Sequence, residues 1–490
     1  MADLHPHTPV LVGVAAVQQK EPDFERALEP VDLMARALQA AAEDAGSLAL
    51  LQRADEIQVP KGMWHYSDPA RLVADKVGAV NARTVLAEIG VLQQSMMTRA
   101  CQAIQSGEAD IMLVVGGEAK YRGLCAAKAG AEAKETEQTD AVPDETLLPD
   151  DEIWDIVESA TGLGMPVGFY AIIDSALRFR QGLSVDQHRD QMAAMYQRFS
   201  EVATRNPDAW SDTAVAAEDI REGSPRNRML AFPYTKLHNS QWNVDQAAGL
   251  VFCSLQTAQS LGIPREKWLF PRASTESNFM SVVTARKDLG GSPGFRLAGQ
   301  RAMDMAGIDF DDITLRELYS CFPSAVRVQL EEFGMQGDGD LTVMGGMTFG
   351  GGPLNNFVLQ ATVRMGQLLR DQPSEVGLVT SVSGMLTKQA CALWSTDPGD
   401  AQWAFEDVSD AVRAECELCE VVGEVTGPCR VAGYTVLYQG DEPWRAVAVF
   451  DMPDGRRTAA YSEAPAIIAD MLSSTECCGR EYVLAKGQFS

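Results

Sequence analysis

The chain repeats one pattern of buried strands and amphipathic helices in two halves. The first copy runs from an apolar segment, TPVLVGVAAV (8–17), to a second one, ADIMLVVGGE (109–118). The second copy runs from WLFPRAS (268–274) to SEVGLVTSVSGM (374–385). Short runs rich in Val, Leu and Ile that alternate with helices of 3.6-residue periodicity indicate parallel sheets covered on both faces. The duplication therefore predicts two packed α/β layers.

Two further segments interrupt and follow the duplicated pattern. Between the halves, residues 120–245 are mostly helical, with AIIDSALRFRQ (171–181) and HRDQMAAMYQRFSEVA (188–203) as the clearest helices. After residue 400, strand alternation with Gly and Asp-Gly turns begins at CEVVGEVTG (419–427) and ends at REYVL (480–484). This pattern predicts a small β domain, a closed barrel of about five strands.

The composition excludes several classes of partner. The net charge is −27, so the surface repels nucleic acid and anionic membranes, and we expect neither as a partner. Much of the acid lies in residues 132–155, which we interpret as a solvated loop. No segment approaches the roughly 18 apolar residues of a membrane span. Ten cysteines without a secretory signal indicate reduced thiols and a cytoplasmic protein.

The order and spacing of several motifs resemble the thiolase superfamily, in particular its sterol-carrier-protein type. QAIQSGEADIMLVVGGE (102–118) resembles the family's helix after the nucleophile and the core strand that follows. TKLHNSQWNVDQAAGLVFCS (235–254) resembles the segment that returns from the loop domain to the core. RELYSCF (316–322) lies where these thiolases carry an HDCF or NEAF motif. The resemblance covers residues 8–396, and the final β segment is similar to the extra C-terminal domain of thiolase-like proteins of type 1.

The resemblance implies an α/β fold: a duplicated, five-layered αβαβα core, a helical loop domain and a C-terminal OB-like β-barrel. We expect residues 1–119 and 246–400 to form the core, residues 120–245 the loop domain, and residues 401–490 the barrel.

A dense glycine run, GGMTFGGGPLNN (345–356), marks a loop that needs positive φ or a close approach of backbone to another group. In thiolases this loop reads GG, four residues and GHP, and its histidine helps to activate the nucleophile and holds the thioester oxygen. Pro353 matches the proline, but the histidine position is Gly352. The resemblance implies that the last glycines of the run contact the substrate: Gly350, Gly351 and Gly352.

Three other catalytic positions implied by the resemblance are also replaced. The nucleophilic cysteine falls at Gly90, the acid/base cysteine falls around residues 381–383, and the HDCF histidine aligns with Tyr319. The nearest cysteine, Cys101, lies well inside the following helix and is expected to be a buried core thiol. Loss of a nucleophile or its base costs on the order of 10⁶ in rate, about 8 kcal/mol, so we do not expect ordinary thiolase chemistry.

Tyr319 and His238 are the remaining catalytic candidates. Tyr319, in LYSCF, could donate a hydrogen bond to an oxyanion or act as an acid, or its hydroxyl could simply be satisfied by backbone. Cys321 in the same motif is interpreted as a core residue. His238 lies among polar residues just before AAGLVF (247–252), which we interpret as a helix, and either contacts a ligand or belongs to a hydrogen-bonded core segment. His188 is expected at the surface or in a loop.

CoA or an acyl-CoA is the small-molecule ligand that the resemblance implies, and no other cofactor is expected. Arg226, Arg228 and Lys236 precede the return to the core and suit phosphate, although they could equally be exposed bases that balance an acidic surface. Cys416 and Cys419 form the only spacing typical of a metal site. Because no second CxxC follows, we expect unpaired core cysteines and no metal.

Three functions agree with these observations. The first is an acyl-CoA-handling protein of the acetyl-CoA acetyltransferase family in which thiolase chemistry is absent or altered. The second is a retro-aldolase acting on a CoA ester through Tyr319, as in thiolase-fold aldolases that work with an OB-fold partner domain. The third is a non-catalytic acyl-CoA-binding scaffold. The resemblance leaves open whether the chain is a monomer or a homodimer.

Overall fold

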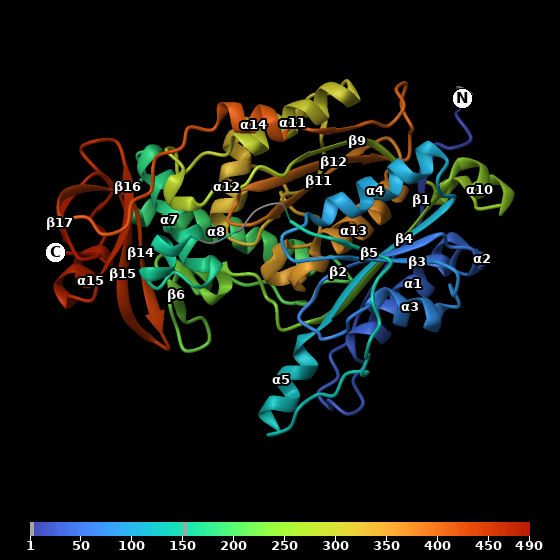
Figure 1. Ribbon diagram of the computed structural model, residues 1–490, viewed down its shortest axis with the longest axis horizontal. Coiled ribbons are helices and arrows are strands. Elements are labelled where there is room, and N and C mark those ends of the chain that lie inside the picture. Colours follow the sequence, from blue (N-terminus) through green and yellow to red (C-terminus); the bar gives the residue numbers. More distant parts are fainter. Residues whose placement is uncertain (1–3, 150–152, 154) are drawn as a thin grey trace.

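The computed structural model of the protein describes residues 4–149, 153 and 155–490. The chain is elongated, with the first half at one end and a C-terminal β structure at the other (Figure 1). Of the acidic segment predicted to be a loop, residues 150–152 and 154 lie outside the described residues. Among the described helices, none combines the length and the apolar character that crossing a membrane requires.

The first half folds around a six-stranded sheet. Its strands, in spatial order, are β1 (Pro9–Gln18), β8 (Asp245–Ser254), β4 (Ile111–Ala119), β2 (Glu56–Pro60), β3 (Arg83–Ala87) and β5 (Glu145–Leu147). Strands β2, β3 and β4 are parallel, and β8 runs antiparallel between β1 and β4. The prediction of a helix for AAGLVF was wrong, because the run lies in β8. Every residue of β8 is buried, as suits a central strand covered on both faces.

The second half is built on a five-stranded sheet, and two helices separate the sheets. The strands of the second sheet are β10 (Leu315–Glu317), β11 (Val376–Ser383), β12 (Lys388–Ser395), β9 (Phe270–Ser277) and β13 (Phe405–Asp407). Helices α4 (Gln93–Ser106) and α13 (Phe357–Asp371) share one apolar core with both sheets (Figure 1). Helices α1 (Pro30–Ala45) and α3 (Pro69–Val77) cover the outer face of the first sheet, and α11 (Pro293–Ala306) packs on the second. The layers follow the order αβαβα, as predicted.

The inserted segment contributes helices beside the core. They are α5 (Lys120–Lys128), α6 (Ile156–Ala160), α7 (Pro166–Arg180), α8 (Val185–Ala203) and α9 (Ala217–Arg221). The start of α8 is fixed by a capping box between Ser184 and Gln187. The surface position predicted for His188 was wrong. Its ring is fully buried, with Nε2 2.9 Å from Asp174 Oδ2, because α8 packs this face against α7.

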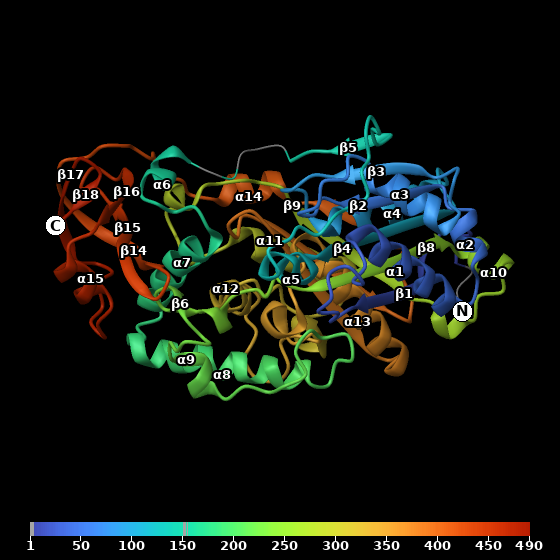
Figure 2. The ribbon, with the colours of Figure 1, turned by 90° about the horizontal axis from the view of Figure 1, so that it is seen from below.

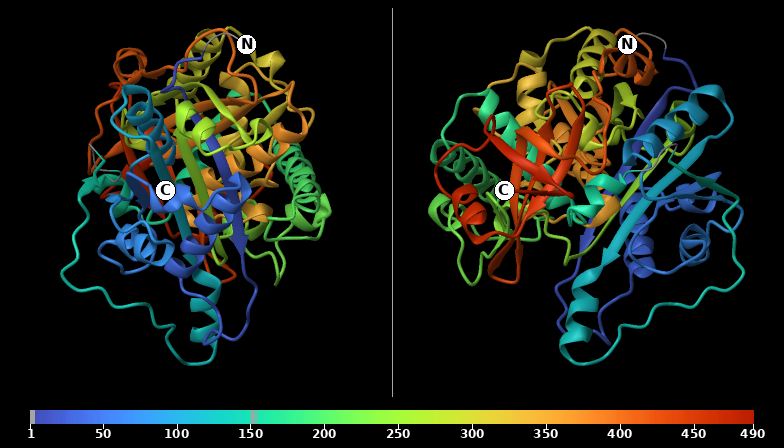
Figure 3. Two further views of the ribbon diagram at one scale, coloured as in Figure 1. Left: turned by 90° about the vertical axis from the view of Figure 1, so that its right-hand side faces the viewer. Right: turned by 60° about the vertical axis from the view of Figure 1, so that its left-hand side comes forward.

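The acidic segment between α5 and α6 is docked to the core, contrary to the solvated loop predicted for it. Residues 134–149, here called the strap, run as an extended chain along the outside of the first half (Figure 3). Near its end the strap forms β5, which pairs in parallel with β3 (Figure 2). The strap therefore covers an edge strand that would otherwise be open.

The C-terminal segment forms a closed, five-stranded barrel. Its strands, in order around the ring, are β14 (Gly427–Gln439), β15 (Glu442–Asp451), β16 (Arg457–Ser462), β18 (Gln488–Phe489) and β17 (Glu481–Ala485). The ring closes where β17 pairs with β14. The strand predicted from residue 419 begins only at Gly427. The Cys419 N–H donates to Ala285 O of the core at 2.7 Å, and Val421 meets Arg457 of β16 only in an isolated bridge.

The remaining short elements connect these layers. They are α2 (Ala49–Gln52), β6 (Met229–Ala231), β7 (Tyr234–Thr235), α10 (Leu255–Ser260), α12 (Pro323–Glu332), α14 (Ser409–Glu415) and α15 (Pro465–Met471). Strands β6 and β7 form a hairpin that pairs with β14, so the inserted segment is joined directly to the barrel.

Candidate functional site

The two helices between the sheets begin side by side. Helix α4 starts shortly after Gly90, and α13 starts shortly after Gly352. The N–H of Val358 in the first turn of α13 donates to Oε1 of Gln93 at the start of α4, at 2.9 Å. Because free N–H groups and the positive end of the dipole gather at a helix N-terminus, this junction favours an oxygen-rich or anionic group. It is the place where the two halves can form one site.

The backbone at Gly90 excludes a side chain. Its φ is 104°, a left-handed conformation that favours glycine. A Cβ at this position would lie 2.9 Å from the Cβ of Pro149 in the strap. From the other side, Nζ of Lys388 donates to the Gly90 carbonyl at 3.1 Å. The space that a nucleophile would need above Gly90 is occupied by Pro149.

The start of the glycine run is held by a buried carboxylate. Oε2 of Glu317 accepts hydrogen bonds from the N–H groups of Val343 and Met344, both at 2.8 Å. The hydroxyl of Thr342 donates to the same oxygen at 2.8 Å and accepts from the N–H of Gly346 at 2.9 Å. Burial raises the pKa of Glu317 to about 7, although these hydrogen bonds act to lower it. The loop is thus fixed by a group that titrates near neutral pH.

The end of the glycine run is packed against the protein's own side chains. A Cβ at Gly351, whose φ is 101°, would lie 2.1 Å from Oε1 of Gln246. A Cβ at Gly352 would lie 2.0 Å from Oγ of Ser240. The carbonyl of Gly350 accepts from Nε2 of Gln246 at 3.0 Å. Glycine is needed here because of close approach to polar side chains, and substrate contact by these glycines remains a prediction.

Three phenols lie near the thiol of Cys321. Tyr319, Tyr170 and Tyr196 all lie close enough to Cys321 for electrostatic interaction. Burial raises the pKa of every one of these groups, and that of Cys321 to about 12. The cluster therefore offers neutral hydrogen-bond donors at neutral pH, with no thiolate to act as a nucleophile.

Tyr319 is positioned by its backbone and its ring. Its N–H donates to Oγ1 of Thr380 at 2.7 Å, and its ring meets that of Phe357 edge-on, with centroids 6.1 Å apart. The next residue, Ser320, accepts a hydrogen bond at Oγ from the N–H of Met347 at 3.0 Å. The tyrosine is half-buried and is tied to the glycine run and to the first residue of α13.

His238 lies one ring away from this cluster. Its ring centroid is 5.4 Å from that of Tyr196. Nδ1 accepts from the N–H of Thr235 at 3.2 Å, which leaves the proton on Nε2. Burial lowers the pKa of His238 to about 3, so the ring is neutral. Nε2 has no hydrogen-bond partner among the described residues.

Comparison with known proteins indicates the family. The model of the family described as "Thiolase C-terminal domain-like" matches residues 275–356. A monomeric SCP2-thiolase-like protein type 1 from Mycobacterium smegmatis is 25% identical, and its structure aligns with a TM-score of 0.83 over 99% of each chain. These similarities support a place in the thiolase-like superfamily.

Two further relatives are more distant. An acetyl-CoA acetyltransferase from Methanocaldococcus jannaschii is 23% identical over 266 residues, which are 54% of this thiolase-like chain and 60% of that relative. The match thus spans less than two thirds of that protein. The Ltp2–ChsH2(DUF35) aldolase is 18% identical, with a TM-score of 0.58 over 79% of this chain and 98% of the other, and this similarity shows the fold alone.

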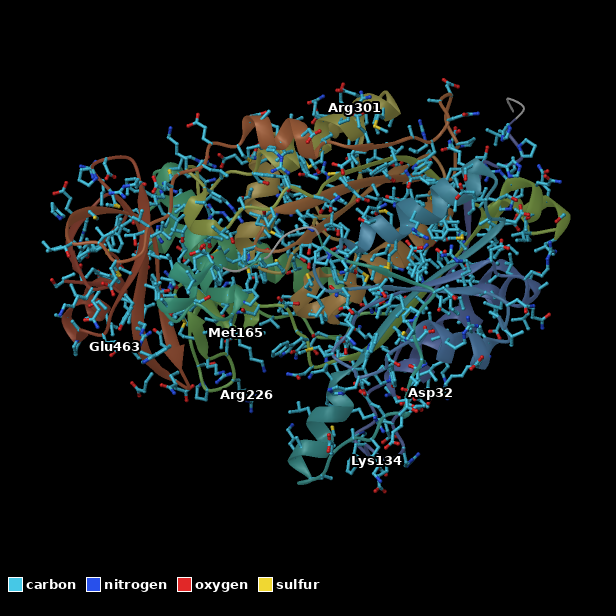
Figure 4. All side chains as sticks on the ribbon, viewed as in Figure 1. Asp32, Lys134, Met165, Arg226, Arg301 and Glu463 are labelled. Carbon is cyan, nitrogen blue, oxygen red and sulfur yellow. The ribbon has the colours of Figure 1, made fainter. Side chains whose placement is uncertain are left out.

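The basic residues predicted to hold CoA lie apart from the helix junction. Arg226 and Arg228 precede the β6–β7 hairpin and Lys236 follows it, and all three side chains are exposed. The Lys236 N–H donates to the Arg228 carbonyl at 2.8 Å, so the hairpin holds these two residues together. Arg226 lies at the lower edge of the molecule in Figure 4. None of the three forms an ion pair within the described part of the chain.

Sequence analysis of this thiolase-like chain missed two residues at the site. Lys388 is 1% exposed. The sequence feature that could have revealed it is a charged residue at the start of a mostly apolar strand, KQACALWS. Tyr170 comes from α7, and its hydroxyl accepts from the N–H of Leu386 at 3.1 Å, in the turn before Lys388. The sequence held no signal for Tyr170, because only the docking of α7 brings it there.

The cysteines are free thiols, and only part of the prediction for them holds. Cys101 and Cys321 are buried as expected, whereas Cys416 and Cys419 are half-buried rather than in the core. Among residues 4–149, 153 and 155–490, no group of three or more His, Cys, Asp or Glu side chains could hold a metal ion.

Proposed function

We propose that this thiolase-like chain binds a CoA thioester and does not form the acyl-enzyme of thiolases. One observation carries the proposal: at Gly90, the position that the resemblance gives to the nucleophile, the left-handed backbone and Pro149 leave no room for a reactive side chain. Cys321 does not replace it, because a thiol whose pKa is about 12 is neutral at physiological pH.

The groups that remain are suited to holding a carbonyl oxygen. A neutral phenol such as that of Tyr319 donates a hydrogen bond to a carbonyl or a developing oxyanion but does not attack it. Tyr319 is connected through Ser320 to the glycine run, whose equivalent faces the thioester in the family. These contacts support binding and polarisation of a thioester carbonyl.

The charged end of CoA would contact the β6–β7 hairpin. Exposed cations without carboxylate partners are notable in a chain of net charge −27, and guanidinium groups bind phosphate in a forked geometry. Arg226, Arg228 and Lys236 are thus the proposed phosphate ligands. His238 is buried as a neutral ring beside Tyr196. This environment favours a role in packing against Tyr196 over a role in acid–base catalysis.

Calorimetric titration with CoA and acetyl-CoA at low salt, together with a thiolysis assay, tests the proposal. We expect micromolar binding and no thiolysis above background. The triple variant Arg226→Gln, Arg228→Gln, Lys236→Gln should weaken binding at least tenfold, about 1.4 kcal/mol. A matched triple variant, Arg36→Gln, Arg53→Gln, Lys128→Gln, removes the same charge from exposed positions elsewhere and should leave the affinity unchanged.

Two results would overturn the proposal. Thiolysis at a rate typical of thiolases would show that another group replaces the nucleophile. If no heat of binding is detected at millimolar ligand, the protein does not bind CoA. The remaining function would then be that of a scaffold that does not use this ligand.

A second candidate is retro-aldol cleavage of a CoA ester. Tyr319 and Tyr170 placed together beside Cys321 favour it, since phenols can stabilise the enolate that such a cleavage releases. The β-barrel, if it is OB-like, would take in cis the place of the partner domain of thiolase-fold aldolases. Products from a CoA-linked aldol that disappear in Tyr319→Phe, with binding retained, would support this reaction over simple binding.

We also propose that the protein is a monomer in the cytoplasm. The relative from Mycobacterium smegmatis is described as monomeric, and the strap covers the edge of β3 in this chain. Ten free thiols agree with a reducing compartment. Light scattering of the purified protein would detect a dimer.

A further inference from the structure

The strap is held to the core mainly by polar contacts. The side chain of Gln138 accepts from the N–H of Asp68 and donates to its carbonyl, both at 2.8 Å. Oδ2 of Asp144 accepts from the N–H of Thr84 at 2.8 Å. Of its apolar side chains, Leu147 packs half-buried against the core, whereas Val142 is 79% and Leu148 68% exposed. Segments with few buried apolar contacts are the ones that open at low cost.

The strongest contact is an ion cluster at β5. Arg99 of α4 binds both oxygens of Glu145, with Nη2–Oε2 at 2.6 Å and Nη1–Oε1 at 3.1 Å. Arg83 of β3 reaches Glu145 at 3.3 Å. Both arginines also bind Glu56, at 3.2 and 3.3 Å, so they keep a buried partner when Glu145 leaves. Release of the strap therefore leaves no buried charge without a partner, and the contact can be reversible.

Just beyond β5 the strap lies over the helix junction. The Glu88 N–H donates to the Leu147 carbonyl at 2.9 Å, and Pro149 then occupies the space above Gly90. Nζ of Lys388 donates to the carbonyl of Gly90 at 3.1 Å. A ligand group that takes the position of a side chain on Gly90 must first displace Pro149.

We propose that the strap is a gate, latched by Glu145 on Arg99 and Arg83, that competes with the acyl end of a CoA thioester for the space above Gly90. This inference rests on the proposed function. In the closed state Pro149 excludes the ligand, and in the open state the start of α4 and Lys388 become accessible. Since closed and bound states exclude each other, a weaker latch raises the apparent affinity for the ligand.

The variant Glu145→Gln tests the latch, and Glu137→Gln is its control. Glu137 lies in the same strap, is exposed and has the same charge, but forms no ion pair among the described residues. Hydrogen exchange at Glu88 and acylation of Lys388 by acetic anhydride, both read by mass spectrometry, report opening. Acetyl-CoA titration reports competition.

In Glu145→Gln we expect about threefold or faster exchange at Glu88, faster labelling of Lys388, and a comparable gain in acetyl-CoA affinity. Glu137→Gln should match the wild type in all three. Raising the salt concentration on the wild-type protein should increase the exchange in the same way, because ionic screening weakens the latch. This measurement stays informative if Glu145→Gln does not fold.

The results separate the gate from the proposed function. Unchanged exchange and labelling in Glu145→Gln, or unchanged exchange with salt if that variant does not fold, would overturn the gate whatever the ligand does. Faster opening with an unchanged affinity for acetyl-CoA would overturn the competition. If Glu145→Gln opens faster but neither it nor the wild type binds acetyl-CoA, the result would uphold the latch and contradict the proposed function instead.

Discussion

Arg178 in α7 is fully buried and donates two hydrogen bonds to the carboxylate of Glu476, which lies between α15 and β17 of the C-terminal segment, with Nε–Oε2 at 3.0 Å and Nη2–Oε1 at 2.8 Å. Its Nη2 also donates to the hydroxyl of Tyr434 in β14 at 3.2 Å. One guanidinium thus joins the inserted helices to the barrel. Because the arginine of this ion pair is buried, the pair holds the barrel against α7 more firmly than a surface ion pair could.

The variant Arg178→Ala should lower the free energy of unfolding by about 3 kcal/mol, because it leaves a cavity and removes the donors to Glu476 and Tyr434. Denaturant unfolding followed by tryptophan fluorescence measures the change. Arg430→Ala is the matched control, since the pair that Arg430 forms with Glu481 is more than half exposed on both sides, and its cost should stay within about 0.5 kcal/mol. Equal losses in the two variants would contradict a docking role for Arg178.

Gly90→Cys should not create a thiolase. The φ of 104° costs a residue with a side chain about 1–3 kcal/mol, and the contact with Pro149 adds to it. We expect a lower unfolding midpoint and no thiolysis of acetoacetyl-CoA. Gly90→Ala is the control, because it carries the same backbone strain without a thiol. A stable Gly90→Cys protein with thiolase activity would mean that Pro149 yields readily.

Gly352→Ala should destabilise the glycine run through one identifiable clash. The new Cβ would lie 2.0 Å from Oγ of Ser240, and overpacking of this kind costs about 1–3 kcal/mol. Ser240→Ala removes that oxygen, so the double variant should regain most of the lost stability. Thermal unfolding of the four proteins forms a double-mutant cycle. No recovery in the double variant would place the strain at the backbone carbonyl of Met347, 3.2 Å away, instead.

The layers of the fold could be predicted from periodicity, because each sheet strand is an apolar run and each covering helix has one buried face. AAGLVF was misassigned because a short apolar run of small residues fits a helix and a central strand equally well. The first strand of the barrel was placed too early for a different reason. Residues 419–426 alternate like a strand but pair with β16 only through an isolated bridge at Val421, which no local pattern reveals.

The candidate site could be predicted only at positions that lie in or near motifs similar to those of the family. Spacing pointed to Gly90, Tyr319 and the glycine run, which lie near the starts of α4 and α13. It could not predict that Pro149 fills the space at Gly90, because a polar, acidic segment has the composition of a free loop whether or not it docks. Nor could it predict Lys388 and Tyr170, whose positions depend on contacts between distant elements.

Glu317 should make the glycine run sensitive to pH. Its pKa is raised to about 7 by burial, above the usual 4.5 of a glutamate, so between these values the unfolded chain loses its proton first. Stability is therefore greatest below pH 4.5 and falls as the pH rises toward 7, by at most about 1.4 kcal/mol per unit for this group. Burial also raises the pKa of Glu276 and Glu118 to about 7 and that of Asp245 to about 6, so the wild-type slope contains the contributions of other carboxyl groups as well.

Glu317→Gln isolates one of these contributions. A glutamine can still accept from the N–H groups of Val343 and Met344 through its oxygen while its nitrogen donates to the Thr342 hydroxyl, but it does not titrate. We expect its stability to fall less steeply than that of the wild type between pH 4.5 and 7. Glu317→Ala leaves the Val343 N–H unpaired and the Met344 N–H with only Thr342 Oγ1 at 3.2 Å, and should cost about 2–4 kcal/mol at every pH. Unfolding midpoints measured at intervals across this range compare the three proteins, and parallel curves for the wild type and Glu317→Gln would contradict ionisation of Glu317 in the folded state near pH 7.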